Sequence, residues 1–286
     1  MSITNDRKDY IGGSDISAVM GLSRWKTPLQ LWAEKTGAVE PEDISNKDAV
    51  KWGNRLEEVC ASAFEEESGL KVRRAPQLYV SKDYPFMRCQ VDRLITGTDD
   101  LLEIKTASAW KEKEWEGEEI PQEYILQVQW QLMITGRKTG YIAVLIGGQK
   151  FLWKKIEADY SIFQSMIESA LNFWKMVQEK TPPMAMPDDN SFIVELYPKG
   201  DDRMVEASQD ISDAIKQLQL LKAEEIKIKE EKEKIEVKIK EAIKNLGGIK
   251  TPEYLVKWSF VRGSTYTVIK KDSRQLRVTK IEGAKK

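Results

Sequence analysis

The sequence predicts an α/β fold in which a mixed sheet is flanked by helices, followed by a long coiled-coil helix and a small β unit. Three observations predict it. Residues 1–180 show patterns in the order helix, three strands, helix, two strands, helix, without the regular alternation of a doubly wound fold. Residues 205–246 keep apolar positions at alternating spacings of three and four, interrupted by Glu225 and Lys232. Residues 247–286 carry ten Lys or Arg against three Asp or Glu and contain strand-like runs.

The sequence indicates where the helices of the first domain begin and end. Residues 11–36 predict short helices broken by glycine and proline. Residues 48–68 place apolar side chains near helical spacing, and Gly69 marks the stop. Residues 121–136 begin with proline and end with glycine, which is typical of a helix with both ends defined. Residues 159–179 return to a helical pattern.

Strand-like runs lie between these helices. Residues 71–80, 86–95 and 101–106 are rich in apolar and β-branched positions, and the turn-rich "TGTDD" separates the last two. A β-meander is the simplest interpretation. Residues 140–148 and 150–157 add two further strands. The first domain therefore resembles a layered α/β sandwich of about 180 residues.

The composition narrows the chemistry. The 286 residues include no histidine and two cysteines, Cys60 and Cys89, which we interpret as buried small hydrophobes. Histidine-based triads and the usual zinc sites are therefore excluded, and hydrolysis would have to rest on Asp, Glu, Lys and oxygen-bound cations. No apolar run has the length of a membrane span, and residues 1–10 lack the apolar stretch of a signal peptide, so we expect a cytoplasmic protein. Residues 181–204 open with "TPPMAMPDD" and predict a linker.

The stretch "VDRLITGTDDLLEIKTAS" gathers Asp92, Glu103 and Lys105. Side chains alternate across a strand, so Glu103 and Lys105 share one face while Ile104 points into a core. Asp92 on the preceding strand can lie beside them, and two carboxylates suit magnesium. The pattern alone also fits a solvent-facing decoration of a hairpin. The apolar surroundings favour the metal, because an unpaired buried carboxylate is costly.

Asp92 with Glu103-Ile104-Lys105 resembles the PD-(D/E)xK nuclease signature. Three further stretches, "RKDYIGGSDIS", "WGNRLEE" and "EYILQVQW", resemble in order and spacing the lambda-exonuclease or YqaJ-like family of phage recombination nucleases. The resemblance spans residues 5–178. It implies a restriction-endonuclease-like core with a mixed sheet flanked by helices.

The resemblance also implies roles for the central residues. Asp92, Glu103 and the Ile104 carbonyl would be metal ligands, and Lys105 would serve the attacking water. The cofactor would be Mg²⁺, with Mn²⁺ as a substitute, and two ions are expected. Glu57, in "WGNRLE", would assist the metal or the water; the alternative is a solvated helix face.

Further residues follow from the same resemblance. Gln127 would orient the site, with Tyr124 one turn earlier on the same helix face, unless Gln127 is an ordinary exposed glutamine. Arg7 and Ser14 match positions that grip a terminal 5′-phosphate, to which an arginine and a hydroxyl are suited. Ser14 could instead cap a helix. Arg24 would lie near the DNA entrance, or else be a surface arginine.

The function implied is a magnesium-dependent 5′-to-3′ exonuclease on double-stranded DNA ends, encoded by a phage or prophage and working with a single-strand annealing protein. A homo-oligomer, a toroidal trimer, would permit processive degradation. An endonuclease with the same metal site and a non-catalytic DNA-binding scaffold are the alternatives. For the long helix and basic tail the expected role is coiled-coil interaction, with DNA contact by the tail as the alternative.

Overall fold

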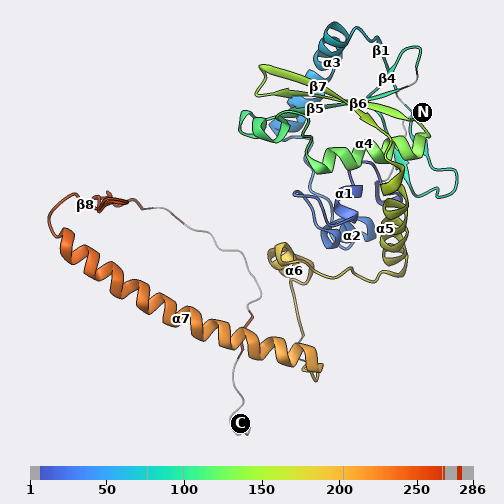
Figure 1. The fold of residues 1–286 in the computed structure, drawn as a ribbon. Helices are drawn as coiled ribbons and strands as arrows, with labels where there is room; N and C mark the ends of the chain where they lie inside the picture. The colour runs from blue at the N-terminus through green and yellow to red at the C-terminus, as the bar shows by residue number, and fades with distance from the viewer. Residues whose placement is uncertain are drawn as a thin grey trace. The chain divides into compact units, whose positions relative to one another are not determined.

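The structure is a computed structural model, and it describes residues 7–75, 77–98, 100–201, 203–265, 267 and 276–278. Contacts divide the chain into two compact units, Met1–Tyr197 and Pro198–Lys286. The first unit holds a five-stranded mixed sheet between helices, which confirms the predicted fold class (Figure 1). In the described part of the chain, none of the helices has the length and apolar character needed to cross a bilayer.

The sheet places one strand, β5, at its centre. The strand order is β1-β4-β5-β6-β7, with β5 and β6 parallel and the other neighbours antiparallel. The strands are β1 Val72–Arg74, β4 Arg93–Ile95, β5 Leu101–Ala107, β6 Thr139–Ile146 and β7 Lys150–Glu157. Because β5 is paired on both edges, its backbone is held rigidly and can present side chains in fixed positions.

Helices cover both faces of the sheet. Helix α3, Asp48–Ser68, lies on one face, where Phe64 and Ile104 share a buried apolar cluster. Helix α4, Gln122–Thr135, crosses over from β5 to β6 and lies on the other face, with Leu132 in a second cluster (Figure 1). Successive side chains of β5 therefore point alternately toward α3 and toward α4.

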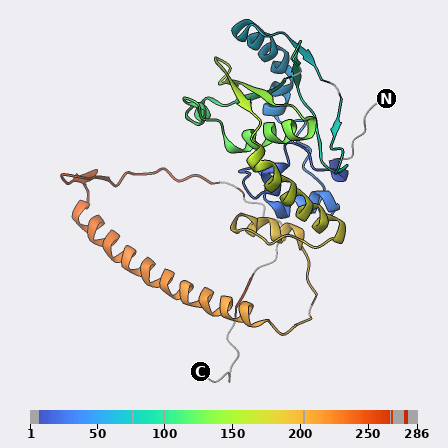
Figure 2. The ribbon, with the colours of Figure 1, turned by 45° about the vertical axis from the view of Figure 1, so that its right-hand side comes forward.

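Three more helices form a layer beyond α4. They are α1 Ile16–Val19, α2 Pro28–Thr36 and α5 Tyr160–Glu179. Their apolar faces meet α4 in a third buried cluster that includes Trp130 and Phe173. Figure 2 shows the same stacking from a second direction. The short helices expected within residues 11–36 are confirmed.

Glycines end the main helices where the sequence predicts. Gly69 follows α3 with φ of 72°, and Gly136 follows α4 with φ of 69°. This left-handed conformation suits glycine because it lacks a Cβ atom. Cys60 and Cys89 are buried free thiols, as expected.

The predicted meander holds only for β1, β4 and β5. Residues 71–80 and 86–95 each divide into two strands, and their inner halves, β2 Tyr79–Val80 and β3 Arg88–Cys89, form a separate two-stranded sheet. The chain bends between β3 and β4, where the side chain of Asp92 accepts a hydrogen bond from the backbone of β5. A run of apolar residues does not reveal this bend.

The expected linker, residues 181–204, is partly folded against the first unit. It contains the 3₁₀ turn η3 Pro187–Asp189 and helix α6 Asn190–Leu196. Thr27 Oγ1 donates to Asp189 Oδ1 at 2.5 Å, and the Asp189 side chain is fully buried. Phe192 packs on the cluster beyond α4. The first unit therefore extends to Tyr197 rather than to residue 180.

Among its described residues, the second unit contains a long helix and a short hairpin. Helix α7, Gln209–Ile243, is 35 residues long and lies within the predicted 205–246. Strands β8 Gly248–Lys250 and β9 Leu255–Lys257 pair antiparallel. The strand-like runs predicted farther along residues 258–286 are not strands where they are described, and the others lie outside the described residues.

Candidate active site

Glu103 lies at the centre of the candidate site. It projects from β5 toward α4, and only 3% of it is exposed. Both carboxylate oxygens accept hydrogen bonds: Oε1 from Lys105 at 2.6 Å and from Gln127, and Oε2 from Gln131 at 2.6 Å. Ile104 points to the opposite face, into the cluster under α3. The strand alternation thus places Glu103 and Lys105 on one face, as the sequence predicts.

Asp92 lies beside Glu103, just before β4 begins. Its Oδ2 accepts the backbone N–H of Ile104 at 2.8 Å, which ties the bend to the central strand. Burial, together with the negative charge of Glu103, raises the pKa of Asp92 to about 7, against the opposing effects of Lys105 and the Ile104 N–H. Two carboxylates are therefore held close together at a site that disfavours their joint ionisation.

Lys105 partly balances this charge. Its Nζ lies 5.3 Å from the ring centroid of Tyr124, in addition to its bond with Glu103. Burial lowers the pKa of Lys105, but the nearby Glu103 and Asp92 carboxylates outweigh burial and hold that pKa above its ordinary value. The ammonium group is thus kept charged next to the carboxylate pair.

Helix α4 contributes two glutamines at one face. Gln127 and Gln131 are one turn apart, and each donates to a different oxygen of Glu103. Gln131 Nε2 also donates to the Gln90 carbonyl at 2.9 Å, two residues before Asp92. The Gln131 side chain is buried, and its Oε1 has no hydrogen-bond partner among the described residues. The sequence prediction includes Gln127 but not Gln131, whose i+4 spacing is the one available signal.

Glu57 lies on α3, on the other side of the sheet. It accepts a hydrogen bond from Arg93, whose side chain is almost entirely buried and also donates to the Asp92 carbonyl at 2.8 Å. Arg93 further pairs with Glu58 at 3.1 Å. The Glu57 charge contributes to the raised pKa of Asp92, so the two carboxyl groups influence one another. Glu57 is thus a partner of a buried arginine rather than a purely solvated helix residue.

The donor set fits a hard cation in part. Among the described residues, no group of three or more His, Cys, Asp or Glu side chains lies close enough to hold an ion. Asp92 and Glu103 are a pair, with Glu57 outside it. A divalent cation between the pair would offset the burial and the Glu103 charge that together raise the pKa of Asp92, and water or backbone oxygen would complete its coordination.

The N-terminal motif forms a second cluster of polar groups. Arg7 Nη2 donates to Ser14 Oγ at 2.9 Å and to Asp15 Oδ1 at 3.0 Å. Asp15 also accepts from the buried Lys35 at 2.8 Å and from the Gly12 N–H at 2.9 Å. Burial opposes the charge of Asp15, but Lys35 and Arg7 hold its pKa below the ordinary value. Asp15 thus fixes the guanidinium of Arg7 beside the Ser14 hydroxyl.

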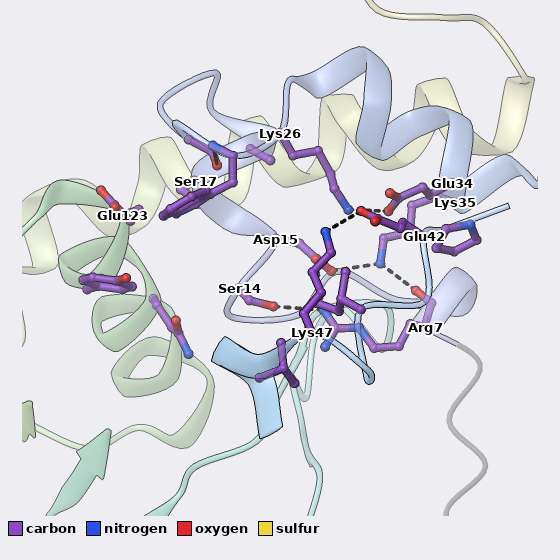
Figure 3. A pocket seen from close by; sticks show the side chains of 18 of the residues that line it. Arg7, Ser14, Asp15, Ser17, Lys26, Glu34, Lys35, Glu42, Lys47 and Glu123 are labelled. Atoms are coloured by element: carbon purple, nitrogen blue, oxygen red, sulfur yellow. Dashed lines mark hydrogen bonds and ion pairs between the residues drawn. The ribbon is translucent and has the colours of Figure 1, made fainter. Parts of the chain in front are cut away.

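Ser14 does not have the capping role considered as its alternative. Helix α1 begins at Ile16, its N-cap is Asp15, and no side chain forms a capping bond there. Ser14 is exposed, and its hydroxyl faces Arg7 instead (Figure 3).

One cavity is lined by residues of both clusters, although Asp92 and Glu103 are not among its lining residues. It has a volume of about 900 Å³, and its lining includes Arg7 and Ser14 at one part and Lys105 and Gln127 at another. Figure 3 shows Arg7, Ser14, Asp15 and Lys35 together along the cavity, with Glu123 on the helix facing them. Six cationic side chains outnumber four acidic ones in the lining: Arg7, Lys8, Lys26, Lys35, Lys47 and Lys105. The surplus of positive charge favours an anionic ligand.

Arg24 is held by two carboxylates. Its Nη1 lies 2.8 Å from Glu114, in the 3₁₀ segment η2 Ala109–Trp115, and its Nε lies 2.7 Å from Glu123 on α4. Arg24 is not among the residues that line the cavity shared by Arg7, Ser14, Lys105 and Gln127.

The comparisons with known proteins agree with this architecture. Residues 4–138 match the YqaJ-like viral recombinase domain. The chain is 37% identical over 250 residues to the uncharacterized protein YqaJ of Bacillus subtilis strain 168, covering 84% of this chain and 77% of that protein. Its fold is similar to that of an alkaline exonuclease from Laribacter hongkongensis, with a TM-score of 0.52, 19% identity, and coverage of 61% of this chain and 91% of that chain. The structure of LHK-Exo with dAMP gives a TM-score of 0.52, 20% identity and the same coverage. On this identity and coverage, the chain belongs to the YqaJ-like viral recombinase family.

Proposed function

We propose that this chain is a divalent-metal-dependent DNA nuclease, a 5′-to-3′ exonuclease that acts on duplex ends. One observation carries the proposal: a single positively charged cavity includes both the Arg7–Ser14 pair and the Lys105–Gln127 side of the carboxylate site. A strand with its 5′-phosphate at the first pair would extend toward the second. Terminal binding and cleavage would then be coupled by one seated ligand.

Asp92 and Glu103 would hold Mg²⁺, or Mn²⁺ in its place, and the Ile104 carbonyl is the proposed third protein ligand; two ions are expected. A bound ion would lower the pKa of a coordinated water and neutralise charge on the phosphodiester. The raised pKa of Asp92 supports this assignment, because burial and the charge of Glu103 both disfavour its ionised form, and a bound cation would favour that form.

The remaining residues would position the reacting groups. Lys105, kept charged by its carboxylate neighbours, would hold the attacking oxygen and favour its deprotonated form. Gln127 and Gln131 would fix both oxygens of Glu103 from α4. Glu57, paired with Arg93, would assist from the α3 side by setting the charge near Asp92.

At the other part of the cavity, Arg7 and Ser14 would bind the terminal 5′-phosphate. Arg7 is suited to this because 55% of its side chain is exposed while Asp15 holds its position. For Arg24 the double ion pair supports the alternative role, a surface arginine that joins η2 to α4.

The wider role we propose is phage or prophage recombination in the cytoplasm of a bacterial host, together with a single-strand annealing protein. Family membership supports the recombination role. A toroidal trimer of the catalytic unit remains our proposal for processive degradation.

The test compares linear duplex with closed circular duplex of the same sequence, with Mg²⁺ and with chelator. We expect release of mononucleotides from linear DNA only, and none with chelator. Nicking of circular DNA at a comparable rate would favour the endonuclease alternative. Binding of DNA without cleavage under either Mg²⁺ or Mn²⁺ would favour the non-catalytic scaffold.

A further inference from the structure

Helix α7 carries a mainly apolar stripe, here called the α7 seam, that the proposed function does not use. Its positions alternate by three and four residues, with Glu225 and Lys232 also in register. The apolar members are Ile211, Ala214, Leu218, Leu221, Ile228, Ile235, Ile239 and Ala242. This is the a/d pattern of a coiled coil.

The α7 seam is exposed in the single chain. Within this helix, whose residues are all described, only Ile243 is buried. Ile228 is 65% exposed and Ile235 61% exposed. A helix of 35 residues gains most of its stability from packing an apolar face, and an exposed row of apolar side chains along it indicates a partner.

The α7 seam has nearly the same order of residue types when it is followed from its C-terminal end as from its N-terminal end. About a point near Ile228, Ala214 mirrors Ala242, and Leu221 mirrors Ile235. Leu218 likewise mirrors Ile239, and Glu225 mirrors Lys232. A second copy of the helix that runs in the opposite direction therefore presents a residue of matching size or opposite charge to each of these positions from Ala214 to Ala242. This is the self-complementarity that a two-fold interface requires.

The two charged positions decide the direction. In a parallel pair in register, Glu225 would face Glu225 of the other copy, and Lys232 would face Lys232, so two layers would contain like charges. In an antiparallel pair, Glu225 of each copy lies within about one helical turn of Lys232 of the other. Polar residues at such positions set the orientation and partner choice of coiled coils. We propose that the α7 seam joins two copies of this chain in an antiparallel coiled coil.

The first test measures the molar mass of the full-length protein by sedimentation at micromolar concentration. Ile228→Asp places a charge in the seam and should halve the number of chains per particle. Val237→Asp is the matched control, because Val237 is 54% exposed on the same helix but lies outside the seam. The test uses the ratio of the molar masses of variant and wild type. The expected ratio is therefore the same whether the catalytic unit is a monomer or a trimer. Equal masses for wild type and Ile228→Asp overturn the proposal.

The second test addresses direction. Glu225→Lys or Lys232→Glu should weaken association about tenfold, and the double exchange should restore it, because each single change turns both mixed pairs into like pairs. A parallel pair predicts no loss, since a like-charge layer would replace another. Nitroxide labels on Asp213→Cys should lie about 40–50 Å apart in the antiparallel pair, from a rise of about 1.5 Å per residue. A label-to-label distance under about 20 Å, or no distance measurable below about 60 Å, overturns the antiparallel arrangement.

Discussion

Gln131 Nε2 donates to Glu103 Oε2 at 2.6 Å and, through the same nitrogen, to the Gln90 carbonyl at 2.9 Å. One buried amide therefore connects the central carboxylate with the segment that leads to Asp92. The relative position of the two candidate ligands depends on this bridge, because a ligand that is not fixed by a hydrogen-bonded neighbour binds a cation less well.

Gln131→Met should weaken divalent-cation binding and lower kcat by about 10- to 100-fold, with little change in KM for DNA, because it keeps the volume and removes the donor. Calorimetric titration with Mn²⁺ and steady-state kinetics measure the two effects. Gln129→Met is the control: Gln129 is equally buried on α4 but bonds to Glu157 and Asp159, away from the carboxylates. Equal cation affinity in Gln131→Met and wild type would contradict the role.

The raised pKa of Asp92 predicts a pH-dependent stability. Its pKa rises from 3.8 to about 7 on folding, so between these values the folded protein binds more protons than the unfolded chain. The free energy of unfolding should therefore fall as the pH rises through this window. Asp92→Asn should remove up to about 3 kcal/mol of that dependence between pH 5 and pH 8, which covers about two pKa units at about 1.36 kcal/mol each. Urea unfolding of wild type and Asp92→Asn, with chelator, at pH 5 and pH 8 measures this difference. If the free energy of unfolding changes equally with pH in the two proteins, the raised pKa of Asp92 in the folded state is contradicted.

Arg7→Ala should erase the preference for phosphorylated ends. A charge-assisted arginine contact is worth roughly 1.5 to 3 kcal/mol, or about ten- to a hundredfold in rate. Wild type should degrade duplex with a 5′-phosphate faster than duplex with a 5′-hydroxyl, and the variant should degrade both at the slower rate. Lys26→Ala, which removes another cavity cation paired with Glu34, should keep the preference. A wild-type enzyme indifferent to the 5′-phosphate would contradict the terminal-phosphate site.

The boundary of the catalytic unit predicts how truncations behave. A protein that ends at Tyr197 should keep the thermal stability of the first unit, whereas one that ends at Glu179 should lose several degrees in Tm. The shorter protein lacks Asp189, the partner of Thr27, and the apolar contact of Phe192. Calorimetric melting of both proteins provides the measurement. Equal Tm values would show that α6 adds nothing to the core.

Local signals account for the parts of the fold that the sequence predicts. Helices α3 and α4 have amphipathic or apolar runs that end in Gly69 and Gly136, and these signals act within one or two turns. The alternation along β5 predicts which of its side chains share a face. Family resemblance brings the distant residues Arg7 and Glu57 into the same prediction.

Tertiary contacts account for what the sequence does not predict. The bend at Asp92 depends on the Ile104 N–H, twelve residues away, and α6 is ordered by Thr27, more than 160 residues earlier. Gln131 resembles any glutamine in an apolar helix until Glu103 is placed against it. Arg24 finds Glu114 and Glu123 about 90 or more residues along the chain, so its ion pairs cannot be read from its neighbours.

The most direct test of the proposed nuclease site is the initial rate of nucleotide release from 5′-phosphorylated linear duplex with Mg²⁺, compared between wild type and Glu103→Gln. This change keeps the side-chain shape and removes one of the two carboxylates, so we expect a loss of about a thousandfold or more while DNA binding stays within a few-fold. Glu67→Gln, an exposed acidic control on α3, should retain the wild-type rate. A Glu103→Gln protein that degrades the duplex at the wild-type rate would contradict the account.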